Sequence, residues 1–200
     1  MRVYYSSASP FAAKVRMAAR HCDLDIESVA TDTGAEPADL IAANPLGKIP
    51  ALVLDDGTAL YDSRTICDYF DKMTGGQLLP ATLDAWTRVK LVEATADGIG
   101  DALILTVYEE RYRPEEKRHQ AWVDMQMRKA DRGLAVLETL LADLPEQLTT
   151  ADFAVAGLLG WMSFRFKGKL EAERPALSKW LADFPEKFPA FAELGPRPAA

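Results

Sequence analysis

Hydrophobic positions recur along this 200-residue chain with two different spacings, and the change follows the stretch GGQLLP at residues 75–80. Before it, short apolar runs typical of strands are interleaved with segments whose apolar residues recur at helical spacing. After it, every patterned segment has helical spacing only. The pattern predicts an α/β domain over residues 1–76, a linker over 77–83 and an all-helical domain over 84–200.

The order of elements in the first part narrows the fold. The predicted strands are RVYY (2–5), DIESVAT (25–31) and the two arms of ALVLDDGTALY (51–61), which flank a tight turn at Asp56-Gly57. The predicted helices are PFAAKVRMAARHC (10–22), PADLIAAN (37–44) and SRTICDYFDKMTG (63–75), the last with Ser63 as its N-cap. The order βαβ, α, ββα is that of a thioredoxin-like fold.

The second part contains four segments with apolar residues at helical spacing. They cover residues 83–113, 115–144, 148–166 and 175–184. Thr149 precedes Asp152 by three positions at the start of the third segment, which is an acidic variant of the capping box. The spacing of Leu148 and Phe153 around it is that of a hydrophobic staple.

Composition and charge exclude several classes of partner. Hydrophobic residues make up 48% of the chain, which is enough for a substantial core. The 23 basic and 30 acidic residues give a net charge of −7 with no basic stripe, so we expect neither a nucleic acid nor an anionic membrane surface as partner. The start MRVYYSSASP lacks a signal-peptide pattern, and no apolar run approaches the ~20 residues of a membrane span, so we expect a cytoplasmic protein.

The cysteines and histidines predict no disulfide and no metal site. Cys22 and Cys67 are far apart, each within a helical pattern and without a CxxC, so we expect two small buried hydrophobic side chains. His21 and His119 are isolated, whereas a metal needs three or four converging ligands.

The stretch ANPLGKIPAL (43–52) is the first candidate for chemistry. Pro50 lies directly before a predicted strand, where a cis bond would turn the chain and expose the backbone N–H and C=O of Ile49. An extended peptide could pair with that backbone as an added strand. A trans proline would make only a rigid loop, and the spacing leaves both interpretations open.

Two predicted helix starts are further candidates. At YDSRTI (61–66), a free backbone N–H, the Ser63 hydroxyl and the helix dipole could bind a carboxylate, while Asp62 could hold an ammonium group. An ordinary helix cap explains the same residues. In SSASPFAAKVR (6–16), Ser9 and Pro10 have the pattern of an N-cap and a first helical residue, and the same hydroxyl could point at a ligand.

Read in order, SPFAAKVR, NPLGKIP, the DDG hairpin, YDSRTI and the TTAD capping box resemble the soluble glutathione transferases over essentially the whole chain. The likeness extends to small bacterial members with an SPF motif and an ADGIxDA stretch, here ADGIGDA at 96–102. The resemblance implies a thioredoxin-like domain followed by an all-α domain, a homodimer, glutathione as co-substrate and no metal. A small hydrophobic electrophile would be the second substrate.

The resemblance also implies roles for individual residues. Pro50 would be cis, Ile49 would pair through its backbone with the cysteinyl part of glutathione, and Lys48 would contact a carboxylate. Asp62 and Ser63 would hold the amine and the carboxylate of the γ-glutamyl group.

Ser9 falls where several bacterial classes carry a catalytic cysteine and others a catalytic serine. It would cap its helix or donate a hydrogen bond to the glutathione sulfur, and the helix N-terminus would lower the pKa of the thiol. A decrease of ~2 units would leave the thiol mostly ionised at neutral pH. Ser6 and Ser7 could share this role, and exchange chemistry through a protein cysteine is not available at this position.

The electrophile would lie between the two domains, and five residues are candidates to line its site, although residues at helical spacing are more often core. They are Tyr108, Arg111, Tyr112, Trp161 and Phe164.

Two carboxylates four residues apart, Asp97 and Asp101, lie on one predicted helix face beside Gly98 and Gly100. A close approach by another backbone, a charge partner such as Arg64 of a second subunit, or a solvated face would account for them.

The function that follows is nucleophilic attack by the glutathione thiolate on an electrophilic carbon. Two alternatives remain at the level of the sequence. One is a glutathione-dependent isomerase, peroxidase or reductase, and the other is a binding or regulatory protein that keeps the scaffold without turnover.

Overall fold

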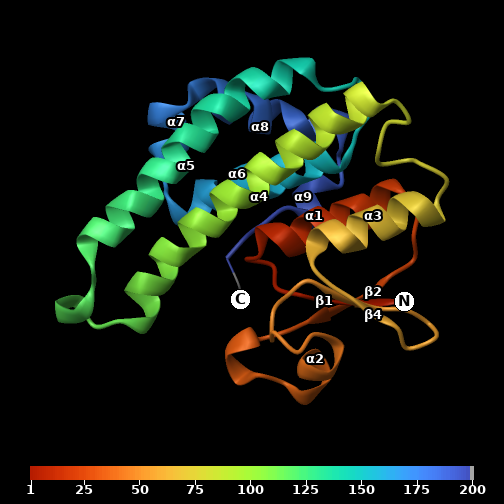
Figure 1. Cartoon of the computed structure of the whole chain (residues 1–200), viewed down its shortest axis with the longest axis horizontal. Helices are drawn as coiled ribbons and strands as arrows, with labels where there is room; N and C mark the ends of the chain where they lie inside the picture. The colour runs from red at the N-terminus through yellow and green to blue at the C-terminus, as the bar shows by residue number, and fades with distance from the viewer. Residues whose placement is uncertain (199–200) are drawn as a thin grey trace.

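The computed structural model describes residues 1–198 and divides into a small α/β part and a larger helical part (Figure 1). The α/β part is built on four strands, β1 (Arg2–Tyr5), β2 (Glu27–Ala30), β3 (Ala51–Val53) and β4 (Ala59–Leu60). Their order in the sheet is β2-β1-β3-β4. The pair β1 and β2 is parallel, whereas β1 with β3 and β3 with β4 are antiparallel, which confirms the predicted thioredoxin-like arrangement.

Three helices cover the two faces of this sheet. Helices α1 (Pro10–His21) and α3 (Ser63–Met73) lie side by side on one face, and α2 (Ala38–Ala43) lies on the other (Figure 1). A short 3-10 turn, η1 (Thr33–Ala35), precedes α2. The core beneath α1 and α3 also receives Phe153 and Phe184 from the helical part, so the two parts share one apolar core.

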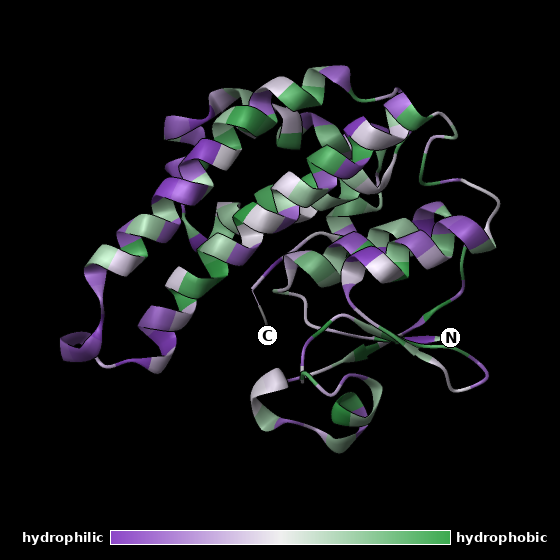
Figure 2. Cartoon of the chain, viewed as in Figure 1, coloured by the Kyte–Doolittle hydropathy of each residue, from purple (hydrophilic) through white to green (hydrophobic). Residues whose placement is uncertain are grey.

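Up to residue 198, the helical part contains six helices. They are α4 (Leu83–Tyr112), α5 (Gln120–Leu140), α6 (Thr150–Arg165), α7 (Lys169–Glu173), α8 (Pro175–Lys187) and α9 (Phe191–Leu194). Helices α4 and α5 form a long antiparallel hairpin, and the almost entirely apolar α6 runs behind it through the centre of the molecule (Figures 1 and 2). Because α6 packs against both α1 and α4, it joins the two parts.

The predicted helix over 115–144 is too long at its start. Residues Glu115–Lys117 form a 3-10 turn, η2, and α5 begins at Gln120. His119 is the N-cap, because its Nδ1 accepts a hydrogen bond from the backbone N–H of Trp122 at 3.0 Å. The helix ends in a second 3-10 turn, η3 (Leu141–Asp143).

The capping box at the start of α6 is confirmed. The Asp152 carboxylate accepts hydrogen bonds from the backbone N–H and the hydroxyl of Thr149, at 2.9 and 2.8 Å. Both side chains are buried, and Leu148 packs against the core that contains Phe153. This cap fixes the first turn of α6 directly against the α/β part.

Helix α3 also holds the connection to the helical part. The Asp71 carboxylate, which is buried, accepts hydrogen bonds from the backbone N–H groups of Leu78 and Leu79, at 3.0 and 2.8 Å. The carbonyl of Leu78 in turn accepts one from the N–H of Thr150. The segment between the two parts is therefore pinned to both.

Cys22 and Cys67 are free and buried, as the sequence predicts. Within residues 1–198, no helix combines the length and the apolar character that a membrane crossing requires.

Candidate functional site

The register of the sheet brings three loops to one edge. Tyr4 pairs with Ala51, and Leu52 pairs with Leu60. If this antiparallel register is extended by two or three residues, the residues that follow β1, precede β3 and follow β4 lie side by side. The residues at that edge are Ser6, Ile49 and Ser63, one from each of the three candidate stretches of the sequence.

The first loop places Ser9 at the N-terminus of α1. Its Oγ accepts a hydrogen bond from the backbone N–H of Ala12 at 3.1 Å, so the predicted N-cap is confirmed. Pro10 follows as the first helical residue, where a missing N–H costs nothing. A hydroxyl that accepts at one lone pair keeps its proton to donate, and the Ser9 proton has no acceptor within residues 1–198.

The neighbouring serines are differently engaged. Ser6 Oγ accepts a hydrogen bond from the backbone N–H of Ala8 at 3.3 Å, and the Ser6 carbonyl accepts one from the N–H of Ser9. The Ser7 carbonyl accepts a hydrogen bond from the N–H of Arg197, so the end of the described chain lies against this loop. Of the three, only Ser9 stands at the N-terminus of the helix.

The second loop presents free backbone groups at Ile49. The Ile49–Pro50 peptide bond is cis. Buried Asn44 shapes the preceding turn, since its side chain donates to the carbonyl of Lys48 at 2.8 Å and accepts from the N–H of Leu46 at 3.1 Å. The N–H and C=O of Ile49 have no hydrogen-bond partner in the described part of the chain, so they are free to pair with an extended ligand.

The third loop leads into α3, and here the predicted cap is wrong by one residue. Asp62 is the N-cap, because its Oδ1 accepts a hydrogen bond from the N–H of Arg64 at 3.0 Å. Ser63 is the first helical residue, and its side chain is buried. A carboxylate caps this helix better than a hydroxyl does, because its negative charge lies at the positive end of the helix dipole. The Ser63 hydroxyl is left without a partner among residues 1–198.

Charged side chains of α4 lie close to the start of α3. Arg64 Nε lies 3.2 Å from Asp97 Oδ2 and 3.8 Å from Asp62 Oδ2. Asp101, one turn further along α4, is partly desolvated, which raises the pKa of its carboxyl against the pull of Arg64 and Lys48. Both aspartates thus face the edge of the sheet at which the three loops meet.

Arg64 of the same chain is a charge partner of Asp97, which corrects one of the three explanations that the sequence left open, an Arg64 supplied by a second subunit. Asp97 also accepts hydrogen bonds from Lys14 of α1, at 3.0 and 2.8 Å. Lys14, which is completely buried, is not among the residues that the sequence singles out. The only signal was one lysine among the apolar residues of the first helix.

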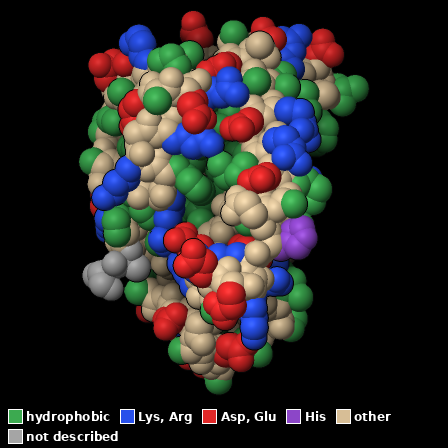
Figure 3. Space-filling view, turned by 90° about the vertical axis from the view of Figure 1, so that its left-hand side faces the viewer, with side chains coloured by type: hydrophobic (Ala, Val, Ile, Leu, Met, Phe, Trp, Pro, Cys, Tyr) green, Lys and Arg blue, Asp and Glu red, His purple; other side chains and the backbone are tan. Residues whose placement is uncertain are grey.

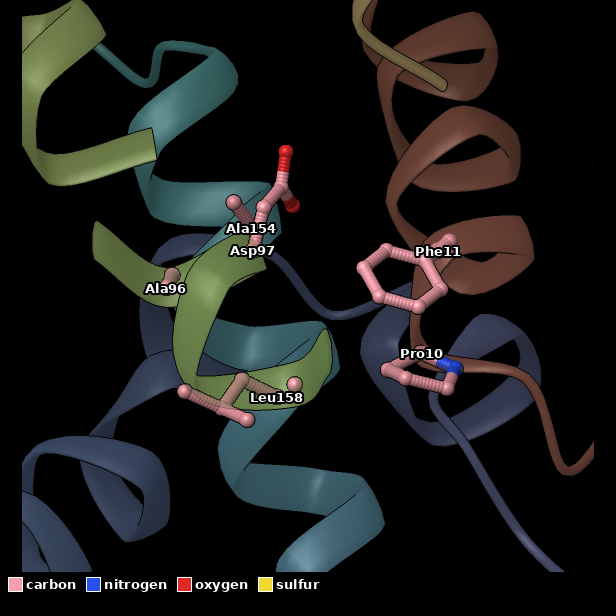
Figure 4. A pocket seen from close by; sticks show the side chains of 7 residues that line it. Pro10, Phe11, Ala96, Asp97, Ala154 and Leu158 are labelled. Carbon is pink, nitrogen blue, oxygen red and sulfur yellow. The ribbon is translucent and has the colours of Figure 1, made fainter. Parts of the chain in front are cut away.

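The glycines beside these aspartates have different surroundings. A Cβ added at Gly100 would lie 3.2 Å from the ring of Phe11, so the close approach is made by a side chain and not by another backbone. Gly98 has no atom within 4 Å of such a Cβ. Figure 4 shows Pro10 and Phe11 of α1 facing Asp97 of α4 and Leu158 of α6 across a narrow crevice.

The candidates for lining an electrophile site divide into two groups. Trp161 is buried in the core and packs edge-on against Phe166, so it belongs to the structural interior. Phe164 is partly buried under the Arg165 guanidinium. The remaining three, Tyr108, Arg111 and Tyr112, lie exposed in the last two turns of α4.

Comparisons with known proteins give the same family for both parts of the chain. The family model of the glutathione S-transferase N-terminal domain matches residues 3–77, and that of the C-terminal domain matches residues 120–183. An uncharacterized GST-like protein of Escherichia coli, YibF, is 31% identical over 169 residues, which cover 82% of this chain and 83% of that protein.

Two solved structures extend the likeness to three dimensions. A glutathione S-transferase from Methylobacterium radiotolerans in complex with glutathione sulfonate has a TM-score of 0.91 and 32% identity, covering 100% of this chain and 96% of that one. A glutathione transferase family member from Pseudomonas fluorescens with bound glutathione has a TM-score of 0.87 and 36% identity, covering 98% and 99%.

Proposed function

Because the chain belongs to the glutathione S-transferase family, we propose that it is an active glutathione transferase that ionises the glutathione thiol for attack on a hydrophobic electrophile. The observation that carries this proposal is a set of three unfilled hydrogen-bonding positions, one on each of the three loops that the strand register brings to the same edge of the sheet. They are the backbone of Ile49, the hydroxyl of Ser63 and the proton of Ser9.

In this proposal glutathione lies along the edge as an added strand. The cysteinyl backbone pairs with the free N–H and C=O of Ile49 beside Pro50. The γ-glutamyl carboxylate binds at the N-terminus of α3, to the Ser63 hydroxyl and its backbone N–H, and Asp62 receives the ammonium group. Lys48, exposed on the loop before Ile49, contacts a carboxylate of the tripeptide.

Ser9 then faces the sulfur. Its Oγ keeps the hydrogen bond from the N–H of Ala12 while its proton is donated to the thiolate, so one hydroxyl both caps α1 and stabilises the anion. The positive end of the α1 dipole acts in the same direction. A pKa lowered by ~2 units, or about 2.7 kcal/mol, would make the thiol mostly ionised at neutral pH.

We also propose a cytoplasmic homodimer with a glutathione-binding domain over residues 1–76 and a helical domain over 84–200. Several large hydrophobic side chains are exposed around α3 and along the first half of α4, and they support an interface between copies of this chain. They are Tyr61, Met73, Leu83, Trp86 and Leu91.

Calorimetric titration with glutathione and S-hexylglutathione tests the binding part of the proposal. The wild type should bind both, Ser63→Ala should bind about tenfold more weakly because one hydrogen bond to a carboxylate is lost, and Ser9→Ala should bind normally. Absence of binding to the wild type would refute the proposal and leave a scaffold protein.

Thiolate absorbance of the bound glutathione tests the activation part. Ser9→Ala should raise the thiol pKa towards its free value of about 8.5, whereas Ser9→Thr, which keeps both the cap and the donor, should not. Ser6→Ala is the matched control, since Ser6 lies in the same loop away from the helix start. A raised pKa in Ser6→Ala alone would transfer the role to Ser6.

Product analysis with halogenated aromatics separates conjugation from isomerase, peroxidase or reductase activity.

A further inference from the structure

The face of α4 that bears Asp97 and Asp101 continues to the end of the helix. Tyr108 and Arg111 follow Asp101 at intervals of seven and three residues, which return to the same side of an α-helix. At 1.5 Å per residue, Tyr108 lies roughly 10 Å beyond Asp101 along the axis. The stripe therefore leads from the edge of the sheet to the exposed last turns of α4.

These last turns carry a cluster of one cation and two aromatic rings. The guanidinium carbon of Arg111 lies 5.9 Å from the ring centre of Tyr108 and 6.0 Å from that of Tyr112. The two rings pack edge to face with their centres 5.4 Å apart. Contacts of this kind hold a guanidinium in place without neutralising its charge.

Arg111 differs from the two arginines that follow it. Arg113 forms an ion pair with Glu109 at 3.3 Å, and Arg118 donates to the carbonyls of Glu110 and Arg113 at the end of α4. Within residues 1–198, Arg111 has neither an ion pair nor a hydrogen bond through its guanidinium. Its planar set of donors is therefore available to a ligand.

The surface turned to the viewer in Figure 3 contains a hollow in which hydrophobic side chains gather, with basic and acidic side chains around it. This view shows the side of the molecule on which the α4–α5 hairpin ends. A hollow of this kind suits the apolar body of a small substrate, and a charged rim suits a polar group attached to it.

We propose that Arg111, which lies beside the rings of Tyr108 and Tyr112, binds a carboxylate on the electrophile, so that the second substrate is an apolar or aromatic acid. The inference rests on the proposed transferase function and names its substrate class. The glutathione sulfur forms a bond to the electrophilic carbon, and the leaving group, for example chloride, departs with the electron pair. The thiol proton goes to solvent, and the carboxylate remains ionised and paired with Arg111 throughout.

A purely structural role for Arg111 is the competing explanation, because a cation in the last turn of a helix stabilises the helix dipole. That role predicts an effect on unfolding and none on discrimination between ligands. The test therefore compares two ligands of the same shape that differ in one charge.

The probes are S-(p-carboxybenzyl)glutathione and S-(p-carbamoylbenzyl)glutathione, titrated into the full-length protein by calorimetry with glutathione as reference. The wild type should bind the carboxylate about fivefold more tightly than the amide, which is the upper end of what an ion pair at an exposed site contributes. Arg111→Gln should reduce this ratio to about one and leave the affinity for glutathione unchanged. High salt should reduce the wild-type ratio as well.

Arg113→Gln is the matched control. It removes the same charge two residues further along the chain, and the Arg113 guanidinium already has an ion-pair partner in Glu109. It should leave the ratio unchanged. Equal affinities of the wild type for the two probes, an unchanged ratio in Arg111→Gln, or the same loss in Arg113→Gln would each overturn the inference. If glutathione itself does not bind, the proposed function fails as well, so the two failures are distinguishable.

Discussion

Lys14 of α1 donates hydrogen bonds to both carboxylate oxygens of Asp97 on α4, at 3.0 and 2.8 Å, and neither side chain is exposed by more than 4%. Lys14 also lies 3.2 Å from Glu93, and Arg64 of α3 lies 3.2 Å from Asp97. One buried carboxylate thus joins α1, whose N-cap is Ser9, to the start of α3. The two helix starts that are proposed to hold glutathione are fixed relative to each other by this contact.

Loss of the Lys14 charge should destabilise the fold. Lys14→Met leaves Asp97 and Glu93 buried with fewer cations, so its free energy of unfolding should fall by about 3 kcal/mol. Combination with Asp97→Asn should recover part of that loss, because one uncompensated charge is removed. Urea denaturation of the wild type, Lys14→Met, Asp97→Asn and the double variant measures both effects, and a Lys14→Met variant as stable as the wild type would contradict the prediction.

The Lys14 amine should make the free energy of unfolding depend on pH in the alkaline range. Burial alone would lower the pKa of Lys14, but Asp97 and Glu93 outweigh it and raise this pKa above its usual value. Since the folded-state pKa exceeds the unfolded one, the contribution is complete below about pH 10.4 and is lost as the pH rises through the folded-state value. The stability difference between wild type and Lys14→Met should therefore shrink above that pH. A difference that stays constant would refute the linkage.

The sequence predicted the elements whose signals are local. Strand β1, helix α1 and the capping box of α6 each follow from patterns that a dozen residues contain. Helices α7 and α9 were not predicted, because five and four residues are too few for a periodic pattern. The start of α5 was misplaced because charged residues near a helix start do not distinguish a 3-10 turn from the helix itself.

The candidate site was predictable to the same extent. Three local features indicate the site in the sequence. They are the serine before Pro10, the proline before β3 and the polar pair Asp62-Ser63 at the start of α3. The contact between Lys14 and Asp97 joins residues 83 positions apart, so no local pattern could show it. For the same reason, the sequence could not place Arg64 beside Asp97 within one chain.

Asp71 should be essential for the connection between the two parts. Asp71→Ala would leave the buried N–H of Leu78 and the partly buried N–H of Leu79 without acceptors, at an expected cost of about 3 kcal/mol in unfolding free energy. Asp71→Asn keeps an acceptor oxygen and should cost about 1 kcal/mol. Equal stabilities of the two variants, measured in urea, would show that the hydrogen bonds do not hold the connection.

The two thiols should be inert in the folded protein. Burial raises the pKa of Cys67, and the positive charge of Lys14 only partly opposes this effect. Burial also raises the pKa of Cys22, against a hydrogen bond from Thr74. A disulfide reagent at neutral pH should therefore label neither residue until denaturant is added. Rapid labelling of the native protein at either position would contradict the described burial.

Gly157 should be required for the position of α1. A Cβ at Gly157 would lie 2.6 Å from the carbonyl oxygen of Pro10, so Gly157→Ala must push the start of α1 away from α6. We expect a loss of about 2 kcal/mol in unfolding free energy. Because Pro10 follows Ser9, the bound glutathione thiol should also have a higher pKa than in the wild type.

The matched control is Gly98→Ala on α4, where no atom lies within 4 Å of an added Cβ. It should raise the unfolding free energy by up to about 1 kcal/mol through helix propensity and leave the thiol pKa unchanged. A Gly157→Ala variant with wild-type stability and thiol pKa would show that the contact between α1 and α6 does not set the position of Ser9. Destabilisation with an unchanged thiol pKa would separate the fold from the activation of the thiol, and would point to Ser9 being held by its own loop.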